Sequence, residues 1–487
     1  MLKELSEEAY RAKAAAGGVI PVYREYLADM ETPVSVLSRV GEEDSFLLES
    51  VAGGAGARYS FLGVDPTATV FSKDGAVFIK RPAGIEFTPY LDILDALRAE
   101  LKNKNFKPDP TLPPLQGGAI GYLAYDSIST FEPRVKLTPE EGSPIAAFML
   151  TDTILVFDNL RRTVMIIVAA DTSDPYAYGK ARSKIDELYA RFFLRERPRR
   201  YATGCLNCSS PEPFKPEMTP EEFADIVAKC KNDILNGECI QIVPSQKFVK
   251  YSSVDSVSLY RALRMVNPSP YNLYMKLGEK TLIGSSPEEL VKLTGRKCTT
   301  CPIAGTRPRG KTSEEDLANE AELKADIKEN AEHVMLVDLG RNDLGRVSET
   351  GSVKVSSFAH VERYSHVMHL VSDVEGTLAK DKDGFDLLRA AFPAGTLTGA
   401  PKIRAMELIA QYEKSPRGIY GGAAGYFSYT GDMDFAIVIR TLIKEGDKIT
   451  MRAGAGIVAD SDPMKEYQET VNKSKAVFEA VKFAEAL

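Results

Sequence analysis

The sequence predicts an α+β fold, in which strands come in hairpin groups and helices lie between the groups. The first half holds short segments of alternating polar and apolar residues, such as 45–51, 67–80 and 151–170. Segment 67–80 carries an Asp-Gly pair, a strong hairpin signal, and segment 151–170 turns near Asp158-Asn159. The second half mixes similar strands with long helical patterns. Strands grouped in this way favour an α+β fold over a regular doubly wound sheet.

One short pattern occurs twice along the chain. Residues 117–125 read GGAIGYLAY, and residues 421–429 read GGAAGYFSY. Each copy reads as a strand that starts on glycine and carries aromatic residues at alternate positions. A single recurrence of the pattern is too little to indicate a repeat fold. It indicates instead that the two halves contribute similar strands to packed sheets.

The length of the chain and one irregular stretch predict two domains. At 487 residues, the chain exceeds the usual size of a single domain. Residues 195–220 are rich in Arg, Pro, Ser and Cys and lack periodicity, which is typical of a linker. We therefore expect an N-terminal domain over residues 1–200 and a C-terminal domain over residues 215–487.

Composition narrows the class of protein. Hydrophobic residues make up 44% and charged residues 26% of the chain, as in ordinary soluble proteins. The net charge of −7, with both signs interspersed, leaves no basic field for nucleic acid. No run of 18 apolar residues indicates a membrane span. The charged, helical pattern of residues 1–20 is unlike a signal peptide, so we expect a cytoplasmic protein.

Four of the six cysteines form two C-x-x-C pairs, Cys205/Cys208 and Cys298/Cys301. Such pairs are compatible with a zinc site. The gap between them is long for a compact zinc module, and the second pair lies in RKCTTCPI, which reads as a strand. The sequence favours the strand and leaves zinc as the alternative.

Residues 302–310, PIAGTRPRG, suggest an anion-binding stretch because Gly305-Thr306 is followed by Arg307 and Arg309. A helix is expected directly afterwards, with Thr312 and Glu315 forming a capping box. Its predicted apolar stripe consists of Leu323, Ile327, Ala331 and Val334.

Two helices each carry a pair of glutamates three residues apart. The first bears Glu329 and Glu332 on one face. The second begins at Asp462-Pro463, a favourable N-cap with proline at the first helical position, and bears Glu466 and Glu469. Together the two pairs could bind one hard cation such as Mg²⁺. The alternative is that they are ordinary solvated glutamates.

Cationic and backbone groups near the ends of predicted strands point to a small anionic substrate. Arg440 ends an apolar run, where a charge needs a partner. Residues 454–456, Gly-Ala-Gly, can bring backbone N–H groups close to a carboxylate, and Lys473 lies one turn after Glu469. His369 lies in an apolar run and is either a core residue or a proton donor.

Eight ordered motifs resemble those of the chorismate-utilising enzymes. They lie within residues 215–482 and are, in order, PIAGTRPRG, AEHVMLVDLGRNDLGR, VMHLVS, TLTGAPKIRAMELI, YGGAAGYF, DFAIVIRT, AGAGIVADSDP and EYQETVNKSKA. FLLESV, ARYSFLG and GGAIGYLAYD in the first half resemble the anthranilate synthase component I branch. The resemblance implies two antiparallel sheets packed as a sandwich and surrounded by helices.

The resemblance also assigns a metal and a substrate site. It implies Mg²⁺ as the cofactor, held by Glu332 and Glu469 with Glu329 and Glu466 nearby. The metal and the backbone of residues 454–456 would hold the ring carboxylate of chorismate. The positions that match substrate contacts of the family are Gly305, Thr306, Tyr420, Arg440, Gly454, Ala455, Gly456 and Lys473.

Four positions bear on the chemistry that the resemblance implies. Glu288 matches the general acid that protonates the departing C4 hydroxyl, for which it needs a raised pKa. His369 matches a histidine that assists the later loss of pyruvate. Gln241 stands where water-adding relatives have a lysine base, and glutamine cannot deprotonate water. Ala304 stands where aminodeoxychorismate-forming relatives have a nucleophilic lysine.

These positions favour direct attack of ammonia at C2 and formation of anthranilate, the first step of tryptophan biosynthesis. The chain lacks a G-x-C-x-G glutaminase block, so the resemblance implies a partner glutamine amidotransferase subunit, component II, in a heterotetramer. It also implies feedback inhibition by L-tryptophan. That site would lie in the first domain with residues of the NPSPY motif, and comprises Ser50, Pro270, Tyr271 and Asn272.

Two other functions stay open. An aminodeoxychorismate synthase component I would form a different product, and Ala304 argues against it. A tryptophan-binding regulatory subunit without catalysis is the second alternative. The complete set of matched catalytic positions argues against that one.

Overall fold

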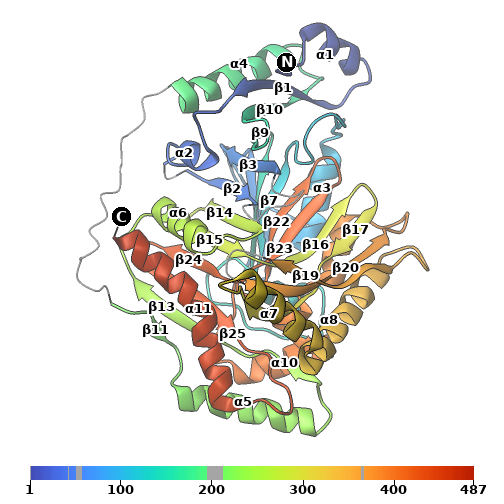
Figure 1. Ribbon diagram of the computed structural model, residues 1–487. Coiled ribbons are helices and arrows are strands. Elements are labelled where there is room, and N and C mark those ends of the chain that lie inside the picture. Colours follow the sequence, from blue (N-terminus) through green and yellow to red (C-terminus); the bar gives the residue numbers. More distant parts are fainter. Residues whose placement is uncertain are drawn as a thin grey trace.

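The computed structural model describes residues 2–41, 43–50, 58–90, 92–194, 212–363 and 367–486. Two large antiparallel sheets pack against each other, and helices cover their outer faces (Figure 1). This arrangement confirms the predicted α+β sandwich. Cys205 and Cys208, and most of the predicted linker, lie outside the described residues.

The first sheet has 11 strands and combines both halves of the chain. Its strands, in spatial order, are β1 (Val19–Leu27), β10 (Thr163–Asp171), β9 (Thr153–Asp158), β3 (Tyr59–Val64), β2 (Ser45–Glu49), β14 (Tyr271–Leu277), β15 (Lys280–Ser286), β24 (Thr441–Glu445), β25 (Lys448–Gly454), β13 (Ser245–Tyr251) and β11 (Lys215–Pro216).

The second sheet has 12 strands and also combines both halves. Its strands, in order, are β18 (Ile303–Pro308), β20 (Val367–Thr377), β17 (Lys297–Thr300), β16 (Glu289–Thr294), β23 (Met433–Ile437), β22 (Ala423–Ser428), β7 (Gly118–Leu123), β8 (Ala146–Thr151), β4 (Ala68–Lys73), β5 (Ala76–Arg81) and β6 (Gly84–Phe87), with β19 (Lys354–Arg363) also paired to β20. A separate pair joins β12 (Gln241–Ile242) to β21 (Gly399–Ala400).

The α-helices pack outside the sheets. They are α1 (Glu7–Ala14), α2 (Pro33–Leu37), α3 (Ile93–Asn103), α4 (Ala177–Tyr189), α5 (Pro220–Leu235), α6 (Ser256–Val266), α7 (Ser313–Ala325), α8 (Ile327–Gly345), α9 (Gly384–Ala391), α10 (Lys402–Tyr412) and α11 (Pro463–Glu485).

The two copies of the repeated pattern are neighbouring strands. β7 pairs antiparallel with β22, and Gly121 lies opposite Gly425. A Cβ atom on Gly121 would lie 2.0 Å from the carbonyl oxygen of Ala147 in β8, so the glycine permits the close approach of β8, the other neighbour of β7. The prediction that both halves contribute similar strands is confirmed.

Alternating side chains along β7 build two cores. Ile120 and Tyr122 belong to the core between the two sheets. Ala119 and Leu123 belong to the core between the second sheet and its outer helices. This alternation follows from the period of two in a β-strand. The central strands are buried on both faces, which explains their almost continuous apolar sequence.

The predicted helix after residue 312 is divided in two. Thr312 caps α7 as expected, but the Glu315 carboxylate accepts a hydrogen bond from the N–H of Lys311 rather than from that of Thr312. Asp326 has an extended backbone, ends α7 and caps α8. Ile327 is 87% exposed, so the predicted apolar stripe is wrong beyond Leu323. The local periodicity did not account for this break.

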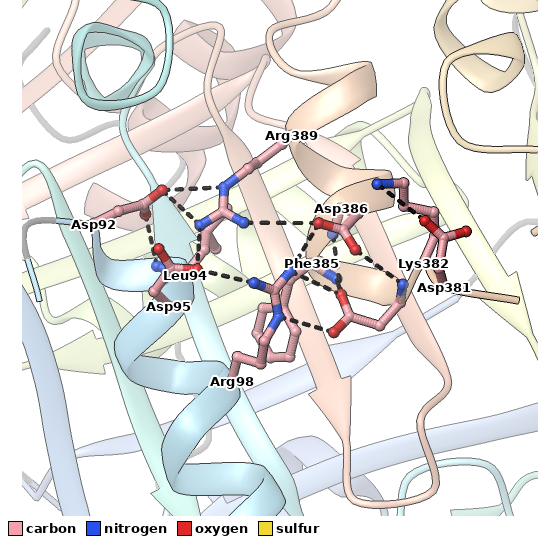
Figure 2. Close-up of polar contacts among 10 residues, drawn as sticks. Asp92, Leu94, Asp95, Arg98, Asp381, Lys382, Phe385, Asp386 and Arg389 are labelled. Carbon is pink, nitrogen blue, oxygen red and sulfur yellow. Dashed lines mark hydrogen bonds and ion pairs between the residues drawn. The ribbon is translucent and has the colours of Figure 1, made fainter. Parts of the chain in front are cut away.

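Reciprocal ion pairs join the two halves outside the second sheet. Arg98 of α3 bonds Asp383, the N-cap of α9, with N–O distances of 2.8 and 3.0 Å. Arg389 of α9 bonds Asp92, the N-cap of α3, at 2.7 Å. Figure 2 shows both arginines between the two helix starts, with Asp95 and Asp386 among the carboxylates around them. Each arginine therefore binds the capping aspartate of the other helix.

The remaining cysteine pair is structural. Cys298 is buried in the outer core of the second sheet, and burial raises its pKa to about 11. Burial also raises the pKa of Cys301, whose thiol lies 3.5 Å from Asp373. Cys298 lies in β17 and Cys301 directly follows it, which agrees with the strand that the sequence favoured for this segment. None of the helices in the described ranges is long and apolar enough to cross a bilayer.

Candidate active site

Glu288 lies between β15 and β16 with a buried side chain. The Thr396 hydroxyl donates a hydrogen bond to its Oε1 at 2.9 Å. Burial raises the pKa of Glu288 to about 7, although the bond from Thr396 and the charges of Arg440 and Lys473 oppose this rise. The carboxyl group is therefore partly protonated at neutral pH and is suited to donate a proton.

Arg440 provides a half-buried positive charge near Glu288. Its backbone has a φ of 49°, an uncommon left-handed conformation for a non-glycine residue, at the start of β24. Burial lowers its pKa, and the charge of Glu288 partly offsets this effect. Within the described ranges, no group accepts a hydrogen bond from its guanidinium. A half-buried cation in this state is a suitable partner for a substrate carboxylate.

His369 lies opposite Thr306 where β20 pairs with β18. Its Nδ1 lies 3.0 Å from the Thr306 hydroxyl and 3.3 Å from the Gly305 carbonyl oxygen. Burial is the main reason that its pKa is lowered, and the charge of Arg440 also lowers it. The imidazole is therefore neutral near pH 7 and can accept a proton.

Gly305 forms the bulge that brings Thr306 to His369. The register shifts between Ala304 and Thr306, and Gly305 has a φ of 59°. A Cβ atom there would lie 2.8 Å from Leu323 and 3.2 Å from the Glu329 carboxylate. Only glycine fits this position without displacing its neighbours.

Gln241 joins the acidic face of α8 to the segment after β25. Its Nε2 donates to Glu332 Oε1 at 3.1 Å, and a Cβ atom on Gly456 would lie 2.8 Å from that nitrogen. Its Oε1 is buried without a hydrogen-bond partner among the described residues. A buried acceptor of this kind favours a ligand that supplies a donor, such as ammonia.

Residues 454–456 pass close to Tyr420. A Cβ atom on Gly454 would lie 2.9 Å from the Tyr420 hydroxyl, whose pKa burial raises to about 12. Lys473 Nζ donates to the Gly454 carbonyl at 3.2 Å. The N–H of Ala455 donates to the Pro244 carbonyl. This amide is therefore occupied in the structure, unlike the free anion-binding amide that the sequence suggested.

The two predicted metal ligands are Glu332 on α8 and Glu469 on α11, and each helix also carries the nearby glutamate of the prediction, Glu329 or Glu466. Burial and then the charge of Glu469 raise the pKa of Glu466. Glu469 pairs with Lys473 at 2.7 Å. Across the described part of the chain, no cluster of three or more His, Cys, Asp or Glu side chains is close enough to hold a metal ion. The carboxylate oxygens of these glutamates are nevertheless the kind of ligand that a hard divalent cation such as Mg²⁺ prefers.

The two arginines of the PIAGTRPRG motif pair with carboxylates within the protein. Arg307 bonds Asp326 at 2.8 Å and Glu329 at 3.2 Å. Arg309 makes two bonds to Asp316, at 2.8 and 2.9 Å. They anchor β18 to α7 and α8, so within this motif Gly305 and Thr306 remain the candidates for substrate contact.

The predicted inhibitor residues come together where β2 meets β14. Asn272 lies opposite Glu49, and Ser50 follows directly. The Asn272 side chain donates to the Ser269 carbonyl and accepts from the Ser285 hydroxyl. The Tyr271 hydroxyl donates to Glu289 at 3.0 Å. Pro270 precedes β14. Because successive residues of a strand point to opposite faces, Tyr271 and Asn272 do not share one surface, and Asn272 is almost completely buried.

Sequence reasoning missed Thr396 and Arg417. Thr396 was within a recognised motif, TLTGAPKIRAMELI, but only the fold brings its hydroxyl to Glu288. Arg417 is 5% exposed and contacts three segments around the site. The available signal was an arginine three residues before the YGGAAGYF motif, which begins at Tyr420.

Comparisons with known proteins identify the family of the chain. A model of the chorismate binding enzymes matches residues 44–479. Anthranilate synthase component 1 from Aquifex aeolicus is 43% identical, and the alignment covers 99% of this chain and 98% of that protein. The same-named protein from Pseudomonas aeruginosa is also 43% identical, with coverages of 98% and 99%.

Solved structures give the same result. Anthranilate synthase component I from Streptococcus pneumoniae TIGR4 superposes with a TM-score of 0.74 and 34% identity, covering 93% of this chain and 99% of that one. The menaquinone-specific isochorismate synthase from Escherichia coli has a TM-score of 0.72 at 19% identity, with coverages of 96% and 95%, and shares the fold. The chain belongs to the chorismate binding enzyme family and, within it, to the anthranilate synthase component 1 group.

Proposed function

We propose that this chain is the aminase subunit of a two-component anthranilate synthase, a lyase that converts chorismate and ammonia to anthranilate, pyruvate and water. The observation that carries the proposal is the buried Glu288, whose carboxyl accepts a hydrogen bond from Thr396 and interacts with the charge of Arg440. This arrangement can bind an anionic substrate and protonate a leaving group on it. Gln241 and Ala304 lack the amine that the other branches of the family use.

The residues act in two stages. Ammonia adds at C2 while Glu288 gives its proton to the C4 oxygen, which leaves as water. The C2 proton and the pyruvyl group are then lost, and the ring becomes aromatic. His369, neutral because burial lowers its pKa, is positioned by Thr306 and Gly305 to assist this second stage.

Mg²⁺ is proposed as the cofactor. The carboxylates of Glu332 and Glu469, with Glu329 and Glu466 beside them, are the donors that would hold it. When bound, the ion would supply positive charge for the ring carboxylate of chorismate. Gln241 donates to Glu332, and Lys473 pairs with Glu469, so each of the two glutamates that would hold the ion has a neighbour that can orient its carboxylate.

The partner and the inhibitor are proposals of the same kind. The relatives are named component 1, which supports a second component, and we propose a glutamine amidotransferase that delivers ammonia. L-tryptophan is proposed to bind at the β2–β14 junction, where Ser50, Pro270, Tyr271 and Asn272 lie. A cytoplasmic location fits this biosynthetic role.

A direct assay tests the proposed function. The purified chain with chorismate, Mg²⁺ and an ammonium salt should produce a compound with anthranilate fluorescence. Glutamine in place of ammonium should give no product without the partner. Formation of aminodeoxychorismate, or no turnover at any ammonium concentration, would overturn the proposal.

A further inference from the structure

We propose that Arg417 is a positioning residue that fixes three segments of the active site relative to one another. The proposal rests on the proposed function, since it concerns the geometry of that site. Arg417 lies in the loop between α10 and β22 and is almost completely buried. Its guanidinium has the planar arrangement of donors that can bridge several acceptors at once.

Two carbonyl groups from separate parts of the chain accept bonds from this guanidinium. Nη1 donates to the carbonyl of Leu397 at 2.6 Å, and Nη2 donates to that of Val243 at 2.5 Å. Leu397 directly follows Thr396, which bonds the Glu288 carboxyl. Val243 follows β12, which contains Gln241. One side chain therefore holds the backbones that carry two functional groups.

The third segment carries a substrate-contacting residue. The guanidinium carbon of Arg417 lies 5.7 Å from the centre of the Tyr420 ring, and 4.5 Å from that of Tyr125. Cation–π contact of this kind is attractive when the cation is desolvated. Tyr420 in turn touches Gly454, so the arrangement extends to the end of β25.

Glu413 compensates for the buried charge. It accepts from Arg417 Nη2 at 2.7 Å, and from the N–H and hydroxyl of Ser245 at 2.7 and 2.9 Å. Arg452 bonds the same carboxylate at 3.3 Å. A buried pair with all these bonds is costly to break. The Arg417–Glu413 pair lies beside the proposed active site rather than in the core between the sheets. This position points to a role in holding the segments of the site in place.

The test compares Arg417→Lys with Arg404→Lys in the full chain. Lysine keeps the charge of Arg417 but cannot reach both carbonyls. Arg404 lies on α10 and pairs with Glu238 and Glu407 away from the site, so it is the matched control. Thermal unfolding and near-ultraviolet circular dichroism give the folded fraction. Anthranilate formation then gives kcat/KM for chorismate as a function of pH.

We expect kcat/KM per folded Arg417→Lys enzyme to fall about tenfold or more, because small displacements of catalytic groups have effects of this size. The descending limb of the pH profile should also move to higher pH, since the bond from Thr396 to Glu288 is weakened. Hydrogen exchange should accelerate at the Val243 amide, which donates to the Thr398 carbonyl. The Arg404 variant should match the wild type in all three measurements.

Wild-type values of kcat/KM and limb position in the Arg417 variant would overturn the proposal, as would a loss that the unfolded fraction fully explains. If Arg417→Lys does not fold, Arg417→Gln, which removes the charge and keeps a donor, undergoes the same comparison. If the wild-type enzyme makes no anthranilate, the proposed function fails. Hydrogen exchange would still decide whether Arg417 holds these segments.

Discussion

Replacing Thr396 with valine should move the pH dependence of the enzyme upward. The Thr396 hydroxyl donates to Glu288 at 2.9 Å, and this bond favours the charged carboxylate. Valine has nearly the same shape but lacks the donor. The pKa of Glu288, which is about 7 in the wild type, should therefore rise further.

The size of the shift follows from the strength of the lost bond. A hydrogen bond to a charged group contributes about 1.5–3 kcal/mol, and one pKa unit corresponds to about 1.4 kcal/mol. Water can replace part of the bond, so we expect a rise of roughly one unit. Glu288 acts as an acid and must be protonated, so activity is lost as pH rises through its pKa. The ratio of the rate at pH 8 to that at pH 7 should increase from about 0.2 to about 0.5.

The assay follows anthranilate fluorescence at saturating chorismate between pH 6 and pH 9. Each rate is divided by the concentration of unprotonated ammonia, because ammonium itself titrates. Thr396→Ser keeps the hydroxyl, so the descending limb of its pH–rate profile should stay at the wild-type pH. Thr398→Val removes a hydroxyl that donates to the Ala394 carbonyl in the same loop, and should leave the limb in place. An unchanged limb in Thr396→Val would refute the role given to this bond.

Three further predictions concern metal, stability and inhibition. Glu469→Gln should raise the Mg²⁺ concentration for half-maximal activity at least about tenfold. The control variant Gln468→Ala, on the same helix, should leave this concentration unchanged. Calorimetric titration with Mg²⁺ makes the same comparison without turnover. Arg98→Ala should lower the free energy of unfolding in urea by about 1 kcal/mol at pH 7, because its partners are partly exposed. This difference should disappear as pH falls through the lowered pKa of Asp383, and its persistence at low pH would contradict the ion-pair explanation. Ser50→Ala should weaken tryptophan binding, and because the chain contains no Trp, the fluorescence of the ligand reports binding directly. Equal affinities would remove Ser50 from the inhibitor site.

Local signals in the sequence predicted local structure well. The Asp-Gly pair forms the β4–β5 turn, where Asp74 and Gly75 have φ values of 52° and 77°. The Asp462 side chain caps α11 by accepting hydrogen bonds from the N–H groups of Met464 and Lys465, as the sequence predicted. The break at Asp326 was missed because a helical pattern continues on both sides of it. Only the packing against β18 and β20 shows which face of α8 is buried.

Candidate site residues could be predicted where they lie in recognisable motifs. Contacts between segments that are distant in the sequence could not. Glu288 and His369 were named as candidate site residues from the motifs around them. The raised pKa of Glu288 depends on burial and on a hydroxyl 108 positions away, which no local pattern contains. The role of Arg417 depends on bonds to two carbonyl groups, and backbone acceptors leave no trace in the sequence.

Both sheets cross the boundary between the two predicted domains. β2 pairs with β14 in the first sheet, and β7 pairs with β22 in the second. Without the N-terminal half, β14 and β22 would become open edges, which promote association with other chains. The proposed tryptophan site lies at the first of these junctions, and β15, the neighbour of β14, leads directly to Glu288. A ligand at the proposed site, beside Ser50 and Asn272, would therefore touch both halves of the chain and would lie one strand away from β15, which leads to the proposed acid Glu288.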